Sequence, residues 1–178
     1  MTSEITTHSG LMVNPLDLRT SDILIEDICW HLSNQCRFSG AVEEFYSVGQ
    51  HSVLCSIIVQ DPAVKFDALM HDASEAYLQD VARPLKEDEY FGRAYRGAEV
   101  RAQKLISAVF DLRWPIPDEV KEVDMRICAT ERRDLMPFSK PGTWSPEWEV
   151  LVPYDLTIKA WTPRRTRREF MLRFDRLR

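Results

Sequence analysis

Apolar residues recur every three or four positions along most of the chain, which is the period of an amphipathic helix. This period predicts helices over residues 22–35, 47–60, 61–83, 89–111, 117–136 and 163–177. The sequence RFSGAVEEFY at 37–46 has a glycine between two short apolar pieces and is typical of a loop or a small hairpin. The Pro- and Trp-rich stretch 137–161 lacks a period, so we expect irregular structure there, with a short strand at 156–161. The predicted fold is therefore all-α, a helical bundle with at most a small hairpin.

Polar residues and prolines indicate where several of these helices begin or end. Ser21, Asp61 and Thr162 each precede an apolar period and are predicted as N-caps. The last two are followed by a proline at the first helical position, where the missing N–H costs nothing. Pro84 disfavours helical backbone at Arg83 and is predicted to end the segment that begins at Asp61.

Length and composition are those of one folded globular domain spanning residues 1–178. The chain has 178 residues, of which 44% are hydrophobic and 29% charged. Its four cysteines form no CxxC pair, which favours reduced thiols in a cytosolic protein. The longest apolar run, near residues 53–59, is too short to cross a bilayer, and the N-terminus lacks a signal-peptide pattern. We therefore expect a cytoplasmic protein that does not insert into membranes.

Charge is unevenly distributed along the chain. The net charge is −5, yet the last segment, from Pro163 to Arg178, carries seven arginines against Glu169 and Asp175. This segment is expected to be a solvated face, a partner for the acidic remainder or for a neighbouring subunit, or else a phosphate-attracting patch. Apolar positions on more than one side of the 89–111 and 163–177 helices, together with the segment from Trp144 to Trp161, predict a homo-oligomer.

Two imidazoles and two carboxylates stand out as candidate metal ligands. His71 and Asp72 are adjacent, while His51 and Asp124 each fall on the apolar stripe of another predicted helix. A mixed nitrogen and oxygen set suits Mn, Fe, Co, Ni or Zn and leaves positions open for water and substrate. Taken singly, His51 is also compatible with a core histidine, and Asp124 with a buried hydrogen-bonding carboxylate. Glu131 lies on the same stripe and is expected to pair with an adjacent arginine, Arg132 or Arg133.

Further polar residues nearby are suited to hydrolysis. Glu75 follows His71 by one helical turn, so it could hold or deprotonate an attacking water. Asp80 could reach in from a loop and protonate the leaving oxygen, although the sequence does not fix which carboxylate takes which role. Arg37 and Lys86 are candidate phosphate ligands delivered by loops, or else ordinary surface charges.

These residues together resemble a known family. His51, the run HDASEAYLQDVARPLK from His71 to Lys86, and Asp124 in VKEVDMRICATERRDL are similar to the H…HD…D signature of the HD-domain phosphohydrolases. Within that family the chain resembles the branch of bacterial 5′-deoxynucleotidases and phage-encoded dATP triphosphohydrolases. The resemblance covers residues 11–136, and less fully the C-terminal helix at 163–177.

The resemblance implies an all-helical HD domain that binds one divalent metal ion, whether Co, Mn, Zn, Ni, Fe or Mg. The residues that would hold it are His51, His71, Asp72 and Asp124. Glu75 would act on the water and Asp80 on the leaving oxygen, while Arg37 and Lys86 would contact phosphate. Phe38 occupies the position where the bacterial deoxynucleotidases have the Trp that presses on the sugar, so sugar selectivity stays open. Members of the family assemble as dimers or larger rings.

Three functions follow as hypotheses. The first is hydrolysis of deoxynucleotides at the 5′ phosphate, with a lean towards a purine dNTP such as dATP and with dNMPs as the alternative substrate. The location would then be a host cytoplasm if the protein is phage-encoded. The second is a phosphodiesterase acting on nucleic acid or a cyclic nucleotide, which the acidic net charge disfavours. The third is a non-catalytic nucleotide-sensing module.

Overall fold

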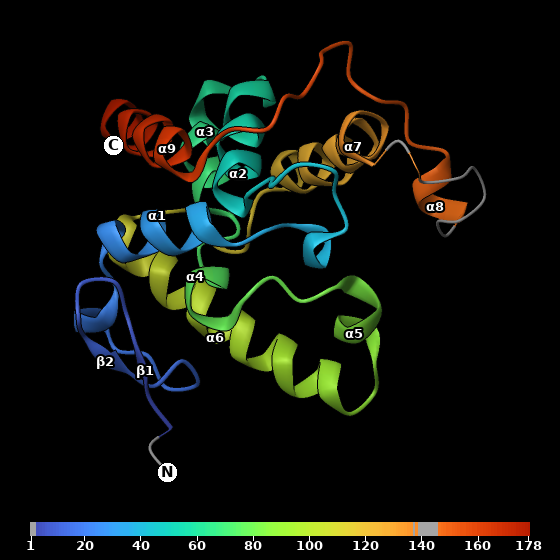
Figure 1. Ribbon diagram of the computed structural model, residues 1–178. Helices are drawn as coiled ribbons and strands as arrows, with labels where there is room; N and C mark the ends of the chain where they lie inside the picture. Colours follow the sequence, from blue (N-terminus) through green and yellow to red (C-terminus); the bar gives the residue numbers. More distant parts are fainter. Residues whose placement is uncertain (1–2, 137, 139–145) are drawn as a thin grey trace.

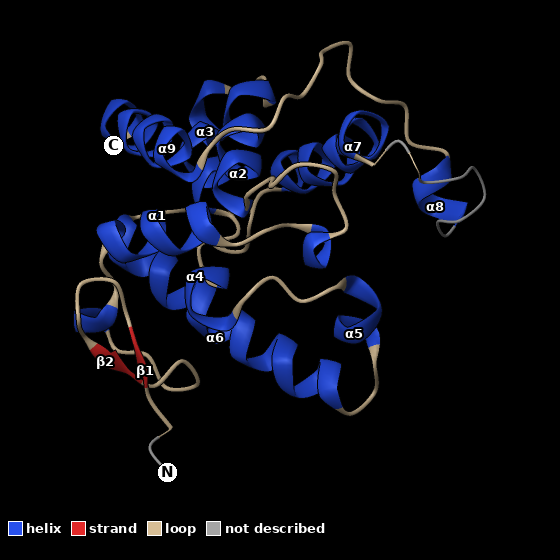
Figure 2. Cartoon of the chain, viewed as in Figure 1, coloured by secondary structure: helices blue, strands red, loops and turns tan. Residues whose placement is uncertain are grey.

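The computed structural model describes residues 3–136, 138 and 146–178, and helices dominate it (Figures 1 and 2). Its one small sheet pairs β1 (Ile5–Thr6) with β2 (Met12–Val13) in antiparallel register, with Ile5 opposite Val13. The helices are α1 (Ile25–Asn34), α2 (Val48–Ile58), α3 (Lys65–Met70), α4 (Glu75–Leu78), α5 (Arg83–Glu87), α6 (Phe91–Phe110), α7 (Asp118–Leu135), α8 (Pro146–Glu149) and α9 (Pro163–Leu177). The expected all-α fold with a small hairpin is confirmed. None of the helices in the described ranges is long and apolar enough to cross a membrane.

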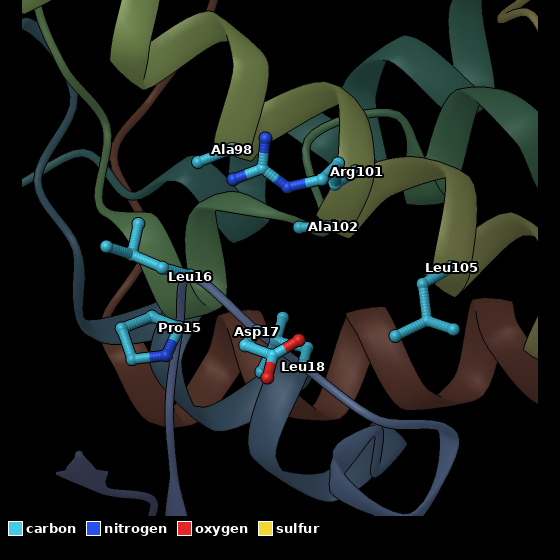
Figure 3. A pocket seen from close by; sticks show the side chains of 8 residues that line it. All are labelled: Pro15, Leu16, Asp17, Leu18, Ala98, Arg101, Ala102 and Leu105. Atoms are coloured by element: carbon cyan, nitrogen blue, oxygen red, sulfur yellow. The ribbon is translucent and has the colours of Figure 1, made fainter. Parts of the chain in front are cut away.

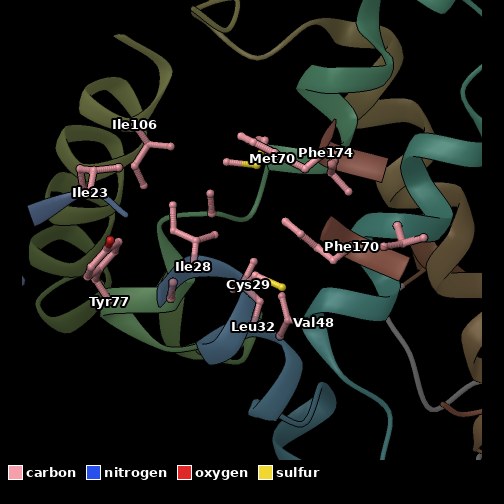
Figure 4. Close-up of a cluster of buried hydrophobic side chains, with 14 of the residues drawn as sticks. Ile23, Ile28, Cys29, Leu32, Val48, Met70, Tyr77, Ile106, Phe170 and Phe174 are labelled. Atoms are coloured by element: carbon pink, nitrogen blue, oxygen red, sulfur yellow. The ribbon is translucent and has the colours of Figure 1, made fainter. Parts of the chain in front are cut away.

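Helix α2 lies at the centre of the fold and contacts α1, α3, α7 and α9. On one side, side chains from α1, α2, α9 and the end of α3 form the larger apolar cluster, which includes Ile28, Leu32, Met70 and Phe170 (Figure 4). A second cluster lies where α2 and α3 meet α7 and includes Ile127. Because α2 is buried between the two clusters, each polar side chain on it needs a partner inside the protein.

Several predicted boundaries are confirmed. Asp61 Oδ1 accepts a hydrogen bond from the backbone N–H of Ala63, and Thr162 Oγ1 accepts one from that of Arg165. Pro62 and Pro163 occupy the first turns that follow. Helices α6 and α7 also lie within one or two residues of the ranges predicted by their apolar periods.

Other predictions of local structure are wrong. Ser21 lies inside a short 3-10 turn, and α1 begins only at Ile25. The predicted 61–83 helix is divided into a 3-10 turn, α3 and α4, and Pro84 lies in the first turn of α5, where its fixed φ suits a helix start. Of the two alternatives for 37–46 the loop is confirmed, with a 3-10 turn at Phe38–Gly40, and the hairpin forms in the N-terminal arm instead. No strand forms at 156–161, and residues 137 and 139–145 of that irregular stretch, with Trp144, lie outside the described residues.

Gly49 permits the close approach of α2 to α1 and α9. A Cβ at this position would lie 2.9 Å from Thr166 Cγ2 and 3.2 Å from backbone atoms of Leu32 and Ser33. We expect Gly49→Ala to lower the free energy of unfolding by about 1–3 kcal/mol, because the α1 backbone cannot move aside without disturbing the core. Urea unfolding measures this, with Gly97→Ala as control, since a Cβ there meets only the end of Arg101 at 3.5 Å. Equal stability of the two variants would contradict the expectation.

Candidate metal centre

Four side chains from three helical segments converge beside α2. His51 comes from α2, His71 and Asp72 follow α3, and Asp124 comes from α7. His51 Nε2 lies 3.1 Å from Asp124 Oδ1, 3.3 Å from His71 Nε2 and 3.6 Å from Asp72 Oδ2. His71 Nε2 lies 3.2 Å from Asp72 Oδ2 and 3.7 Å from Asp124 Oδ1. All four residues proposed as ligands from the sequence are therefore brought together.

Burial differs among the four residues in a way that gives the centre an inner and an outer side. The side chain of His51 is fully buried and that of His71 is 5% exposed. The carboxylates of Asp72 and Asp124 are 19% and 38% exposed. The imidazoles therefore form the floor of the site, and the carboxylates leave an approach from solvent.

Hydrogen bonds on the far side of each ring fix which nitrogen faces the centre. His51 Nδ1 lies 2.7 Å from Glu131 Oε1, and His71 Nδ1 lies 2.9 Å from the carbonyl oxygen of Ala68. A carboxylate and a carbonyl only accept hydrogen bonds, so both Nδ1 atoms carry hydrogen. In each neutral ring the Nε2 lone pair then points to the shared centre. This is the arrangement by which metal-binding histidines are oriented in proteins.

The donor set fits a divalent cation. Two Nε2 lone pairs and two carboxylate oxygens face one another, and such a group of acceptors repels itself unless a cation or protons lie between them. Without a metal, protons take that place: burial alone would lower the pKa of His71, but contact with Asp72 and Asp124 raises it well above its ordinary value. Although burial opposes it, contact with the two histidines holds the pKa of Asp124 well below its usual range.

Cys55 offers an alternative ligand that sequence reasoning did not include. Its Sγ lies 3.5 Å from His51 Nε2, and ligand atoms of His51, Cys55 and His71 lie within 4.8 Å of one another. Its spacing of four residues from His51 on one helix was the available signal. We favour the two carboxylates as ligands because one touches His51 Nε2 at 3.1 Å and both are partly open to solvent, whereas Cys55 is fully buried.

The buried Glu75 pairs with Lys86, a partly exposed residue, next to the centre. Glu75 is 4% exposed, and its Oε1 accepts a hydrogen bond from Lys86 Nζ at 3.1 Å. Its Oε2 has no hydrogen-bond partner among the described residues. Burial first, and then the charge of Asp72, raise the pKa of Glu75 well above its ordinary value. Lys86 lies in α5 rather than in a loop, and its Nζ also donates to Glu99 Oε1 at 2.7 Å.

Asp80 lies between α4 and α5 and is partly buried. Burial raises the pKa of its carboxyl, while the positive charge of Arg37 opposes that rise. Its carboxyl also interacts electrostatically with Asp72 and His51, two of the proposed metal ligands. This position agrees with delivery from a loop, as the sequence suggested.

Arg37 is 9% exposed and reaches from the loop after α1 into the site. Its Nη1 lies 3.6 Å from Asp72 Oδ2, and its Nη2 donates to Glu131 Oε2 at 3.3 Å. The ring of Phe38 lies beside the guanidinium, with its centroid 5.3 Å from Cζ. Phe38 has φ of +55°, an uncommon backbone conformation for a large side chain.

Glu131 does not pair with the adjacent arginines as expected. Its partners are His51, Arg37 and the hydroxyl of Tyr46, which donates to Oε1 at 2.8 Å. Arg132 pairs with Glu149 and Arg133 with Asp134. Consecutive helix positions point about 100° apart, so neither neighbour shares the inward face of Glu131.

Two cavities lie away from this centre. One of about 190 Å³ separates the N-terminal segment around Leu16 from α6, where Arg101 lines it (Figure 3). The other, of about 500 Å³, lies at the ends of α6 and α9, near Asp67 and Arg113. Neither is lined by a proposed metal ligand.

Comparison with known proteins gives relatives but no activity. No family model matches the chain. An uncharacterized protein of Rhodobacter capsulatus is 31% identical over 121 residues, which cover 64% of this chain and 61% of that protein. The uncharacterized protein YfdR of Escherichia coli K12 is 43% identical over 133 residues, which cover 75% of this chain and 72% of YfdR. The chain belongs to the family that includes YfdR.

Proposed function

We propose that the protein is a divalent-metal-dependent phosphohydrolase that cleaves deoxynucleotides at the 5′ phosphate, as an HD-domain protein. One observation carries the proposal. The Nε2 atoms of His51 and His71 lie 3.3 Å apart, and each lies 3.1–3.7 Å from a carboxylate oxygen of Asp72 and of Asp124. The sequence resemblance in the run from His71 to Lys86 supports the same function. YfdR and the Rhodobacter relative are uncharacterized, so their names carry no activity over to this chain.

The residues around the centre suit attack of water on phosphorus. A bound divalent ion would lower the pKa of water and neutralise charge on a phosphoryl oxygen. The unpartnered Oε2 of Glu75 would accept the proton of the attacking water. As the water oxygen bonds to phosphorus, the bond from phosphorus to the 5′ oxygen breaks, and Asp80 in its protonated form supplies a proton to that oxygen. Arg37 Nη1, near Asp72, would orient the phosphate.

Substrate preference is proposed on narrower grounds. The resemblance favours a purine dNTP such as dATP, cleaved to a nucleoside and triphosphate, with a dNMP cleaved to a nucleoside and phosphate as the alternative. The Phe38 ring, which lies beside the Arg37 guanidinium, would contact the sugar. A homo-oligomer and a cytoplasmic location, in a host if the protein is phage-encoded, belong to the same proposal.

The alternative of a phosphodiesterase that binds nucleic acid along α9 is less favoured. The helix packs against α1, α2 and α3, and several of its arginines are engaged within the protein. Arg167 lies over the ring of Trp30, Arg165 over that of Trp161, and Arg173 donates to Ser56. A non-catalytic sensing role is also less favoured, because the buried Glu75 keeps an unpartnered oxygen beside an intact ligand set.

The experiment that tests the function is a substrate panel. Metal-free protein is loaded separately with Co²⁺, Mn²⁺ or Zn²⁺ and incubated with dNMPs, dNDPs, dNTPs and the matching ribonucleotides. We expect release of phosphate or triphosphate from deoxynucleotides, and loss of at least about 99% of the rate on chelation, since the ion contributes several kcal/mol. Chromatography of the released species separates the two substrate classes. Undiminished hydrolysis by the chelated protein would contradict the proposal.

A further inference from the structure

The carboxylate of Glu131 joins the candidate metal centre to Arg37 through a buried hydrogen-bond network. Glu131 is 0% exposed and follows Asp124 on α7 by two helical turns. Its Oε1 accepts hydrogen bonds from His51 Nδ1 at 2.7 Å and from the Tyr46 hydroxyl at 2.8 Å. Its Oε2 accepts one from Arg37 Nη2 at 3.3 Å. Both oxygens thus accept hydrogen bonds from three residues on two other segments, α2 and the loop between α1 and α2.

We propose that Glu131 is a positioning residue that sets the metal-facing nitrogen of His51 and the phosphate-facing arm of Arg37 at the same time. The inference rests on the proposed function, because it assigns the residue a role towards the ion and the phosphate of that reaction.

The first arm of the network acts on His51. A neutral imidazole carries one hydrogen, and the Glu131 carboxylate keeps that hydrogen on Nδ1. The Nε2 lone pair is then available to an ion, and the ring cannot rotate without breaking a buried hydrogen bond. The negative charge of Glu131 also makes Nε2 a stronger ligand than a neutral acceptor would.

The second arm acts on Arg37. With Nη2 held by Glu131, the planar guanidinium directs Nη1 towards Asp72, at 3.6 Å from Oδ2. The fork of a guanidinium is rigid, so fixing one arm fixes the direction of the other. The guanidinium group that would bind phosphate is therefore oriented towards the metal centre before substrate arrives. This reduces the entropy lost on binding.

A purely structural ion pair is the competing explanation, and metal binding separates the two. The probe is Co²⁺, with affinity measured by calorimetry and geometry by visible absorption, alongside thermal unfolding of the metal-free protein. In Glu131→Gln we expect Co²⁺ affinity to fall about 10–100-fold, with a changed absorption spectrum. We also expect KM for the deoxynucleotide to rise about tenfold, as one charge-assisted hydrogen bond to Arg37 is lost.

Two matched variants resolve the arms. Tyr46→Phe removes a donor from Glu131 but leaves both arms intact, so Co²⁺ affinity and KM should stay within about threefold of wild type. Arg37→Gln removes only the second arm, so KM should rise while Co²⁺ affinity stays within the same limit. Glu131→Asp keeps the charge but is too short to reach both partners; its Co²⁺ affinity should also fall, which covers the case in which the glutamine variant does not fold.

The outcomes separate this inference from the proposed function. If wild type binds Co²⁺ and hydrolyses deoxynucleotides while both Glu131 variants bind Co²⁺ with wild-type affinity and spectrum, the positioning role is overturned and the function stands. If the Glu131 variants only unfold at a lower temperature, with Co²⁺ affinity unchanged, the positioning role is likewise overturned and the function stands. If wild type neither binds Co²⁺ nor hydrolyses deoxynucleotides, the function is overturned, and the positioning role with it.

Discussion

Replacement of Asp72 by asparagine is expected to lower the rate of deoxynucleotide hydrolysis by about 1,000-fold or more, equivalent to about 4 kcal/mol of transition-state stabilisation. Asp72 Oδ2 is the oxygen that approaches both His71, at 3.2 Å, and His51, at 3.6 Å. An amide in its place offers either a neutral oxygen or an N–H donor to the ion. We therefore also expect weaker binding of Co²⁺, measured by calorimetry, alongside kcat/KM on the best substrate of the panel.

The fold should survive this change, although the metal-free protein should lose some stability. Burial opposes it, but contact with His71 lowers the pKa of Asp72 below its ordinary value of 3.8. A carboxyl whose pKa is lowered on folding stabilises the folded state at pH values above its ordinary pKa. This contribution is lost as pH falls through the lowered, folded-state pKa. The stability difference from wild type should thus be present at neutral pH and shrink in acid. Asp118→Asn is the control, because this aspartate lies at the exposed start of α7. A rate within tenfold of wild type would exclude Asp72 as a ligand.

The apolar period predicted much of the fold but hid one break that matters for the site. Residues 71–74 form a turn, yet His71 and Ser74 keep backbone angles near those of a helix. The inward stripe therefore continues from Leu69 to Tyr77 although the helix itself is interrupted. Across this turn His71 Nε2 and Asp72 Oδ2 lie 3.2 Å apart, so two adjacent residues face the same centre.

Proline was ambiguous for a physical reason. The same ring that prevents helix before it also fits the first turn of a helix after it, and nothing local to Pro84 distinguishes the two. The sequence consequently placed Lys86 in a loop, whereas it lies on α5 between two carboxylates.

The centre itself was predictable because a polar side chain on an apolar stripe must find a partner inside the protein. His51 and Asp124 met that criterion and do meet each other. Glu131 met it too, but its partner Arg37 is 94 residues away in the chain, and no periodicity connects a loop arginine to a distant helix. Long-range pairs of this kind require the packed structure.

Replacement of Glu75 by glutamine is expected to lower kcat by about 100-fold or more, the usual contribution of a positioned general base. The amide cannot take a proton from water, whereas affinity for Co²⁺ should change little because Glu75 is not among the four proposed ligands. Steady-state kinetics and calorimetry on the same preparation measure both quantities. Glu99→Gln is the matched control: it removes the other carboxylate bound to Lys86 but leaves Glu75 in place. A variant that keeps the wild-type kcat would rule out this role.

The same change should stabilise the metal-free protein at neutral pH, which separates a catalytic role from a structural one. Burial and the charge of Asp72 raise the pKa of Glu75 well above the ordinary 4.5. A carboxyl whose pKa is raised on folding favours the folded state at pH values below its ordinary pKa. This advantage is lost as pH rises through the folded-state pKa. Glutamine is uncharged at every pH, and its amide oxygen can still accept a hydrogen bond from Lys86. The melting temperature of Glu75→Gln should therefore exceed that of wild type by a few degrees at pH 8. The gain should vanish near pH 4, because wild-type Glu75 is then already neutral in the fold. A variant less stable than wild type at pH 8 would contradict this expectation. It would show that Glu75 stabilises the fold through its pair with Lys86.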